Sequence, residues 1–199
     1  FENAMFDVLQ PYPPDPILRL IADFRADSRT DKVDLGVGVY KDESGHTPIM
    51  AAVKAAEHRV FAVEDSKTYI GPAGVPEFNV EIQKLTFGAG HPALASARVA
   101  TVLTPGGCGA LRVGAELLKR AAPDATIWVS DPTWANHIPL LGNAGLKIRE
   151  YPYYDRATST LRFDAMMSAL AEAARGEVVL LHGCCHNPCG ADLDQIGRA

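Results

Sequence analysis

Between residues 98 and 183, apolar segments with the composition of β-strands alternate with amphipathic helical segments. This alternation constrains the fold more than any other feature, because strands separated by helices pair in parallel and are covered on both faces. We therefore predict an α/β fold with a mostly parallel sheet and helices on both faces. The predicted strands are 98–104, 125–130, 146–154 and 177–183, and the predicted helices are 109–121, 137–145 and 163–176, the last capped by Asp164.

The first 88 residues predict three helices and one short strand. A Pro-rich extended arm leads into the first helix, which Asp15 can cap and whose apolar stripe is Ile17, Leu20, Ile21 and Phe24. Pro76 stands near the start of the third helix and Gly88 just past its end. The helices are expected at 15–27, 49–65 and 75–88, and the strand at 33–40.

Composition excludes several classes of protein. The 199 residues carry 19 basic and 24 acidic side chains, a net charge of −5 without a basic stripe, so we expect no nucleic-acid partner. Apolar runs stay shorter than the roughly 18 residues that a membrane span requires, so we expect no membrane association. Four cysteines, three of them within six positions, are not a disulfide framework for a chain of this size, and they favour a reducing cytoplasm.

The two ends of the chain favour a fragment of a longer protein. The chain begins with Phe1 instead of methionine, and its last eight residues, DLDQIGRA, read as the opening of a helix that nothing caps. A natural terminus is the alternative.

Three of the predicted strands are followed by loops of unusual composition. These loops are PGGCG at 105–109, DPTWANH at 131–137 and HGCCHNPCG at 182–190. In open α/β sheets, ligands bind outside the carboxyl ends of the strands. Because all three loops belong to that edge, we predict that they form one composite site.

The loop at 105–109 predicts an oxyanion site. Its glycines allow backbone N–H groups to turn towards an anion, and the helix that follows adds partial positive charge. The loop matches neither the dinucleotide fingerprint nor the P-loop, so we expect a monophosphate on a cofactor or substrate. A tight turn without a ligand is the alternative. Trp134, in the next loop, offers a stacking platform for a flat cofactor, with core packing as its alternative.

The segment HGCCHNPCG contains two histidines and three cysteines but does not have the spacing of a metal site. Zinc sites usually combine two ligand pairs that are well separated in sequence, and the other four histidines form no second pair. Adjacent Cys184 and Cys185 should point to opposite faces of a strand. We therefore expect no metal, and we interpret the cysteines as small buried apolar residues. The remaining feature is a turn, Asn187–Pro188 with Gly190, that holds an amide at the strand end.

With these motifs in place, the chain resembles the N-terminal half of class I pyridoxal-phosphate aminotransferases, in the aspartate and aromatic amino-acid group. The resemblance implies a fold-type I large domain, incomplete here, with an N-terminal arm at 1–14, the start of a small domain at 15–46 and the large domain at 47–199. The segments that carry it, in family order, are DLGVGVYKDESGHTP, SKTYIGPAGVPEF, TPGGCGALR, SDPTWANH, EYPYYD and HGCCHNPCG.

The resemblance assigns three residues to the phosphate of pyridoxal 5'-phosphate. Gly107 and Cys108 match the phosphate-binding turn. Tyr69 matches a tyrosine that reaches the phosphate of the other subunit, which implies a homodimer. Many family members have threonine at the position of Cys108, and a thiol is a weak hydrogen-bond donor, so Cys108 is expected to bind through its backbone N–H. Cys189 also replaces a family threonine.

The resemblance assigns the remaining residues to the ring of the cofactor and to the substrate. Trp134 matches the ring that stacks on the pyridine and also borders the substrate. Asn187 matches the residue that hydrogen-bonds the phenolic oxygen and approaches the substrate. His137 and His182 match histidines near the carboxylate that partners the pyridinium nitrogen. Gly38 matches the glycine beside the substrate carboxylate.

The implied activity is transfer of an amino group between aspartate or an aromatic amino acid and a 2-oxo acid such as 2-oxoglutarate, in ping-pong order. Family chemistry requires a lysine that forms a Schiff base with the cofactor, and we expect it C-terminal to this chain. The chain alone is therefore expected to be inactive. The alternatives are a β-elimination lyase with the same cofactor and a non-catalytic truncated binding protein.

Overall fold

A computed structural model of the chain describes residues 6–7, 9–11, 16–34, 36 and 38–194, with the side chains of 16–18 left out. The chain divides into two compact units, Phe1–Lys67 and Thr68–Ala199. The predicted cap Asp15 lies outside the described residues, as does most of the final segment 192–199.

The first unit contains two helices, α1 (Pro16–Ala26) and α2 (Ala51–Val63). Both confirm helices predicted from the sequence. The strand predicted at 33–40 is wrong for the residues described there, which pair in no ladder. None of the residues of α2 is buried.

The second unit begins with three helices, α3 (Pro76–Phe87), the short α4 (Pro92–Ala95) and α5 (Gly106–Ala121). Gly88 ends α3 with a φ of 86°, as its position in the sequence predicts. The strand predicted at 98–104 is wrong, because this extended segment pairs with no strand among the described residues. Leu103 N–H donates instead to Ala73 O at 3.0 Å.

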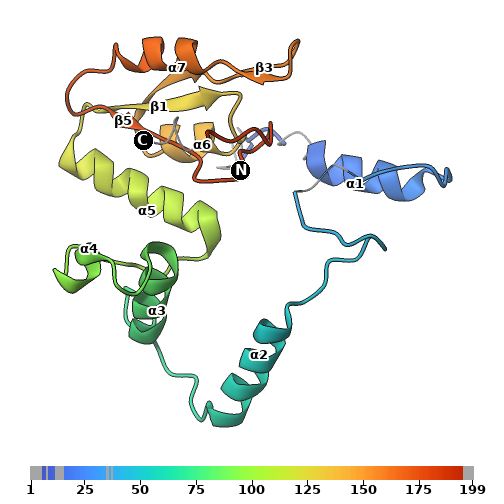
Figure 1. The fold of residues 1–199 in the computed structure, drawn as a ribbon, viewed down its shortest axis with the longest axis vertical. Coiled ribbons are helices and arrows are strands. Elements are labelled where there is room, and N and C mark those ends of the chain that lie inside the picture. The colour runs from blue at the N-terminus through green and yellow to red at the C-terminus, as the bar shows by residue number, and fades with distance from the viewer. Residues whose placement is uncertain (1–5, 8, 12–15, 35, 37, 195–199) are drawn as a thin grey trace. The chain divides into compact units, whose positions relative to one another are not determined.

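A three-stranded parallel sheet forms the centre of the second unit (Figure 1). β1 (Thr126–Asp131) lies between β2 (Lys147–Pro152) and β5 (Val178–Val179). Ile127 of β1 is paired with Ile148 on one side and Val178 on the other. The parallel sheet predicted from the strand–helix alternation is confirmed.

Helices cover both faces of this sheet, as predicted. α5 and α6 (His137–Gly142) lie on one side, and α7 (Phe163–Leu170) lies on the other with the hairpin of β3 (Tyr154–Asp155) and β4 (Thr160–Leu161) (Figure 1). α7 is shorter than predicted. Its N-cap is Arg162, and Asp164 lies inside the first turn, so the prediction of Asp164 as the cap is wrong.

The alternation of side chains along β1 divides the core into two clusters. Ile127 and Val129 pack with Leu141 of α6 and Ala115 of α5. Trp128 points to the other face, where it packs with Tyr151, Tyr153 and Met166. β1 is therefore buried on both faces, which explains the three consecutive apolar residues at its centre, Ile127, Trp128 and Val129.

Trp128 is the largest fully buried side chain, with 1% of its surface exposed. Its indole N–H donates to Glu177 Oε2 at 2.7 Å, and the Arg149 guanidinium lies 4.2 Å above the ring. This hydrogen bond is the main cause that lowers the pKa of Glu177. The indole N–H therefore has a hydrogen-bond acceptor, and the rest of the ring is packed against other side chains.

We predict that Trp128→Ala lowers the free energy of unfolding by about 3–5 kcal/mol, because it leaves a large cavity between β1 and α7. Urea unfolding followed by far-ultraviolet circular dichroism measures this change. Trp134→Ala is the matched control and should cost less, because the Trp134 ring is only half-buried. Equal losses for the two variants would contradict the burial described for Trp128.

Candidate functional site

The parallel pairing of β1 with β5 brings two of the three predicted loops together at the carboxyl edge of the sheet. Thr133, from the loop after β1, has its Oγ1 3.4 Å from His182 Nε2 in the loop after β5. Ser130, near the end of β1, has its Oγ 3.0 Å from His186 Nε2. Side chains separated by about fifty residues in sequence therefore meet in one cluster.

The third loop adjoins this edge through a pocket between α5 and α6. The pocket has a volume of about 210 Å³ and is lined by Cys108, Arg112, Asn136, Pro139, Leu140 and Asn143. Cys108 belongs to the first turn of α5, and Asn136 belongs to the loop that also carries Trp134. The convergence of three loops that the sequence predicts is thus present in the fold.

Five aromatic rings form a continuous column across this edge. The Trp134 and His137 rings meet edge to face at 5.3 Å between centroids, as do His137 and His182. His182 stacks on His186 at 3.9 Å, and His186 stacks on Tyr153 at 4.1 Å. The column connects the buried core to the half-buried ring of Trp134.

Hydrogen bonds fix the tautomers of two of these histidines. The Asn187 backbone N–H donates to His182 Nδ1 at 3.2 Å, so that nitrogen carries no proton and Nε2 does. His182 Nε2–H then donates to Thr133 Oγ1, and the Thr133 hydroxyl donates to His137 Nδ1 at 2.8 Å. The His137 proton is thereby placed on Nε2.

Both histidines are held neutral by their surroundings. Burial is the main cause that lowers the pKa of His137, and repulsion from His182 adds to it. Burial also lowers the pKa of His182, against the opposing attraction of Asp192. A neutral His182 is required, because protonation of Nδ1 would remove the acceptor of the Asn187 N–H.

His186 lies deeper in the site, with 2% of its surface exposed. Its Nε2 meets Ser130 Oγ at 3.0 Å, and its Nδ1 meets Cys189 Sγ at 3.1 Å. Burial, followed by repulsion from His182, lowers the pKa of His186 to about 4. A neutral imidazole with one donor and one acceptor matches these two partners.

The loop that carries Asn187 is braced by the carboxylate of Asp192. Its two oxygens each accept a backbone N–H at 2.8 Å, from Cys185 and from His186. Gly190, with a φ of 67°, closes the turn by donating its N–H to His186 O at 2.7 Å. The predicted turn at Asn187–Gly190 is confirmed, and the Asn187 side chain is exposed.

The cysteines depart from their predicted environment. Cys184 and Cys185 are exposed and Cys189 is half-buried, so the prediction of three buried apolar residues is wrong for the first two. The expectation that Cys184 and Cys185 point to opposite faces assumed a strand that continues through both residues. Strand β5 ends at Val179, and a φ of 51° at Cys185 breaks the alternation.

Within the described part of the chain, no group of three or more histidine, cysteine or acidic side chains is placed to hold a metal ion. The same residues contain no helix long and apolar enough to cross a membrane.

The remaining predicted site residues are not members of the ring column. Gly107 is in the first turn of α5, where a Cβ would meet nothing within 4 Å. The Tyr69 side chain is fully exposed, at 101% of its reference surface. Gly38 belongs to the first compact unit. The roles of all these residues remain predictions.

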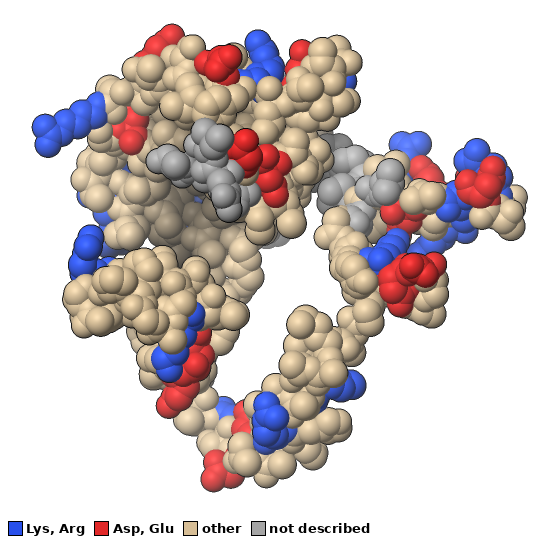
Figure 2. Space-filling view, in the orientation of Figure 1, with Lys and Arg blue, Asp and Glu red and all other residues tan. Residues whose placement is uncertain are grey.

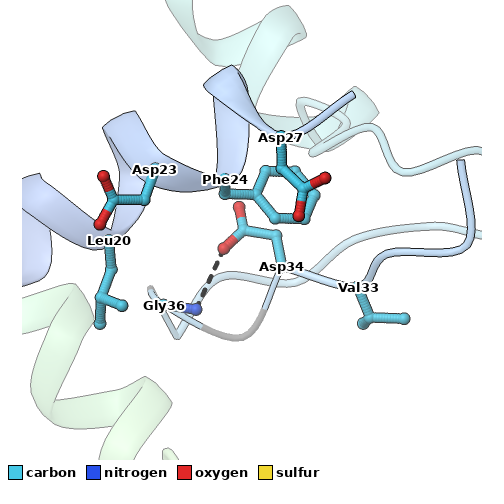
Figure 3. Close-up of a pocket in the computed structure, with 7 residues that line it drawn as sticks. All are labelled: Leu20, Asp23, Phe24, Asp27, Val33, Asp34 and Gly36. Carbon is cyan, nitrogen blue, oxygen red and sulfur yellow. Dashed lines mark hydrogen bonds between the residues drawn. The ribbon is translucent and has the colours of Figure 1, made fainter. Parts of the chain in front are cut away.

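A second pocket, of about 390 Å³, lies within the first unit (Figure 3). Three carboxylates border it, but each is paired with a nearby cation, Asp34 with Lys41 at 2.9 Å, Asp27 with Arg29 at 2.5 Å and Asp23 with Arg19 at 3.8 Å. Asp34 also accepts the Gly36 N–H at 3.0 Å. Because each carboxylate already has a cationic partner, we interpret the acidic lining of this pocket as part of the local fold of the first unit. Its lining is Leu20, Asp23, Phe24, Asp27, Val33, Asp34 and Gly36.

Comparison with known proteins identifies the family. Residues 30–195 match the family model for aminotransferase class I and II. The chain belongs to the class I and II aminotransferases. The resemblance inferred from the motifs is confirmed, together with the fold class.

Curated relatives of this aminotransferase chain include enzymes of two specificities. Aspartate aminotransferase of Escherichia coli K12 is 49% identical over 188 residues, which are 94% of this chain and 48% of that protein. Aromatic-amino-acid aminotransferase of Paracoccus denitrificans is 51% identical over 189 residues, 95% of this chain and 47% of that protein. The chain thus spans about half the length of the curated relatives it matches.

Solved aminotransferase structures have the same fold. An aromatic amino acid aminotransferase from Burkholderia cenocepacia J2315 superposes with a TM-score of 0.92 at 46% identity, over 98% of this chain and 49% of that one. An aromatic-amino-acid aminotransferase from Burkholderia pseudomallei, covalently bound to pyridoxal phosphate, gives 0.91 at 41% identity, over the same shares of the two chains.

Sequence reasoning missed the inner part of the site. It assigned no role to Ser130, Tyr153, His186 or Asp192, which orient the loop around Asn187. The available signal was the position of His186 between two recognised groups, Cys184–Cys185 and Asn187–Pro188.

We predict that the chain loses stability as the pH falls from about 6.5 to 4. In that window the unfolded chain binds a proton at His186, whose ordinary pKa is 6.5, whereas the folded chain does not, because its pKa there is about 4. The stabilisation is complete above pH 6.5, and its loss is on the order of 3 kcal/mol. Urea unfolding at a series of pH values measures it.

His186→Gln should reduce this pH dependence, leaving the smaller contributions of His137 and His182. His58→Gln, at an exposed position of α2, is the matched control and should retain it. If His186→Gln kept the wild-type dependence of stability on pH, the burial of His186 would not be the cause of that dependence.

Proposed function

We propose that this chain supplies part of the active site of a pyridoxal-phosphate-dependent aminotransferase. The enzyme would transfer an amino group between aspartate or an aromatic amino acid and a 2-oxo acid such as 2-oxoglutarate. The observation that carries the proposal is the cluster formed by the loops after β1 and β5, which presents Trp134, His137, His182 and Asn187 together in a chain of this family.

The residues of the site fit a flat, phosphorylated cofactor. The first N–H groups of a helix lack intrahelical acceptors, and α5 is a sixteen-residue helix whose first turn contains Gly107 and Cys108. The half-buried ring of Trp134 has His137 at its edge, which is compatible with stacking. The exposed amide of Asn187 is a donor for a phenolic oxygen.

When bound, pyridoxal phosphate supplies an electron sink for cleavage of a bond at Cα of the amino acid. We propose that the chain's own residues bind and orient this group. The backbone N–H groups of Gly107 and Cys108 bind the phosphate, Trp134 holds the ring plane, and Asn187 donates to the phenolic oxygen. Trp134 and Asn187 also border the substrate, and Gly38 lies beside its carboxylate.

The two neutral histidines have a supporting electrostatic role in this proposal. The hydrogen bonds through Thr133 keep the His137 proton on Nε2, where it can be donated to a carboxylate that partners the pyridinium nitrogen. A neutral pair stabilises the negative charge of that carboxylate less than a cation would, and so leaves its basicity available to the ring nitrogen.

The seven lysines of the chain are engaged elsewhere. Five lie within 4 Å of an acidic side chain, and Lys32 and Lys119 donate to backbone carbonyls. These contacts support the expectation that none of them forms the covalent bond to the cofactor.

We further propose that the protein is a cytoplasmic homodimer with sites shared across the interface. The free state of all four cysteines supports a reducing compartment. The full exposure of Tyr69 supports its assignment to the phosphate of the other subunit. In the same compact unit as Tyr69, Leu85 of α3 is an exposed apolar side chain that an interface would cover. We also propose the domain boundaries that the family resemblance implies, with the N-terminal arm ending at residue 14 and the first part of the small domain ending at residue 46.

Charged residues of both signs are interspersed on the face of the molecule shown in Figure 2. This distribution agrees with small-molecule partners for the proposed enzyme. We propose the amino acid and the 2-oxo acid as those partners.

The intact protein should transaminate with added pyridoxal phosphate, and Trp134→Ala should weaken cofactor binding about tenfold through lost stacking. Fluorescence titration with pyridoxal phosphate measures the affinity, and a coupled assay of 2-oxo acid formation measures the activity. Trp134→Phe is the matched control and should keep most of the affinity, because it retains a flat ring. Wild-type binding by Trp134→Ala, or release of ammonia in place of amino transfer, would reject the proposal.

Mixed dimers test whether Tyr69 acts across the interface. One subunit carries Tyr69→Phe and its partner carries Trp134→Ala. If Tyr69 serves the other subunit, the site with the intact Trp134 also receives the intact Tyr69, so the heterodimer keeps one site of wild-type affinity. If Tyr69 serves its own subunit, each site carries one defect and no wild-type site is present, which would show the assignment to be wrong.

A further inference from the structure

Three consecutive backbone N–H groups of the loop after β5 have fixed acceptors. The Asp192 carboxylate accepts the N–H of Cys185 and that of His186, each at 2.8 Å. The next N–H, of Asn187, donates to His182 Nδ1 at 3.2 Å. The Asn187 side chain is exposed, so the direction of its amide depends on this backbone.

One side chain anchors this segment in the interior. Among the described residues 182–190, only His186 is buried. Its ring nitrogens meet Ser130 Oγ at 3.0 Å and Cys189 Sγ at 3.1 Å. Its ring stacks on His182 at an interplanar angle of 16° and on Tyr153 at 12°, so these two rings cover its opposite faces. Both nitrogens and both faces of His186 are therefore engaged by the protein itself.

These contacts link His186 to both groups that are assigned to the cofactor. It directly precedes Asn187, so displacement of its backbone displaces the amide. Its stack on His182 sets the plane of the ring that bonds to Thr133. Protein interiors are close-packed, so movement of a buried ring is transmitted to its neighbours. We propose that His186 is a positioning residue of the cofactor site, which acts through Asn187 and His182 without touching the cofactor. The inference rests on the proposed function.

Positioning differs from simple filling of space in what the ring must provide. A phenyl ring at this position keeps the packing area and both stacks, but it cannot hydrogen-bond to Ser130 or Cys189. Ser130 is fully buried, and loss of a hydrogen bond costs more there than at a surface where water replaces it. His186→Phe therefore removes the polar anchor and leaves the packing.

The proposed hydrogen bond from the Asn187 amide to the phenolic oxygen of the cofactor provides a measurable signal. A hydrogen bond to the charged form of an acid favours that form, so this bond keeps the pH midpoint of the visible spectrum of the bound cofactor low. Displacement of the amide raises the midpoint. Loss of one hydrogen bond of this kind corresponds to about one pH unit.

The test is a spectrophotometric pH titration of the intact protein reconstituted with pyridoxal phosphate. We expect His186→Phe and Asn187→Ala each to raise the midpoint by about one unit. In the double variant the two shifts should not add, because both changes remove the same hydrogen bond. Leu146→Ala is the matched control. It loses stability in the core cluster on the other face of β1 and should keep the wild-type midpoint.

Circular dichroism shows which variants fold, and a second pair of variants tests the same anchor at its other nitrogen. Cys189→Ala removes the partner of His186 Nδ1 and should also raise the midpoint. Cys189→Ser keeps a hydrogen-bonding group and should stay close to the wild-type value. Equal midpoints in these two variants would contradict the proposal, whether or not His186→Phe folds.

Hydrogen exchange of the Asn187 amide adds a measurement without cofactor. The amide should exchange about tenfold faster in His186→Phe, because its bond to His182 opens more often. A wild-type protein that binds no pyridoxal phosphate would reject the proposed function. If the wild type binds it, an unchanged midpoint or unchanged Asn187 exchange in folded His186→Phe would overturn this inference alone, as would additive shifts in the double variant.

Discussion

Burial of β1 on both faces and along both edges is the constraint on which the rest of the second unit depends. Its odd positions pack under α5 and α6, and its even positions pack under α7. Parallel pairing with β2 and β5 then sends the following loops to the same edge of the sheet. The site is a direct consequence, since Ser130 and Thr133 meet His186 and His182 only because these two strands run side by side.

Sequence reasoning succeeded where local pattern and tertiary packing agree. β1 and the helices α2, α3 and α5 follow from apolar periodicity and from Pro76 and Gly88 at the ends of α3. It failed where a segment can form a strand only if another strand lies beside it. Residues 98–104 have the composition of a strand, but their backbone finds no ladder and Leu103 bonds to a loop carbonyl instead. Composition cannot report the presence of a neighbouring strand.

The candidate site was likewise predicted only in part, because its loops have local sequence signals and its inner contacts do not. The three loops, with Trp134 and Asn187, could be located because glycine-rich turns and strand ends are visible in sequence, and His137 and His182 were added by the family resemblance. The stack of His186 between His182 and Tyr153 could not, because it depends on side-chain orientation in three separate segments. The exposure of Cys184 and Cys185 was missed because the sequence predicts a strand through residue 183, whereas β5 ends at Val179.

The absence of buried residues in α2 has a further consequence for how the chain folds. A helix of thirteen residues is marginal in water unless one face is buried against other structure. Without a buried face, α2 depends on its own backbone hydrogen bonds. We therefore expect the amides of α2 to exchange with solvent faster than those of β1, whose central residues are buried.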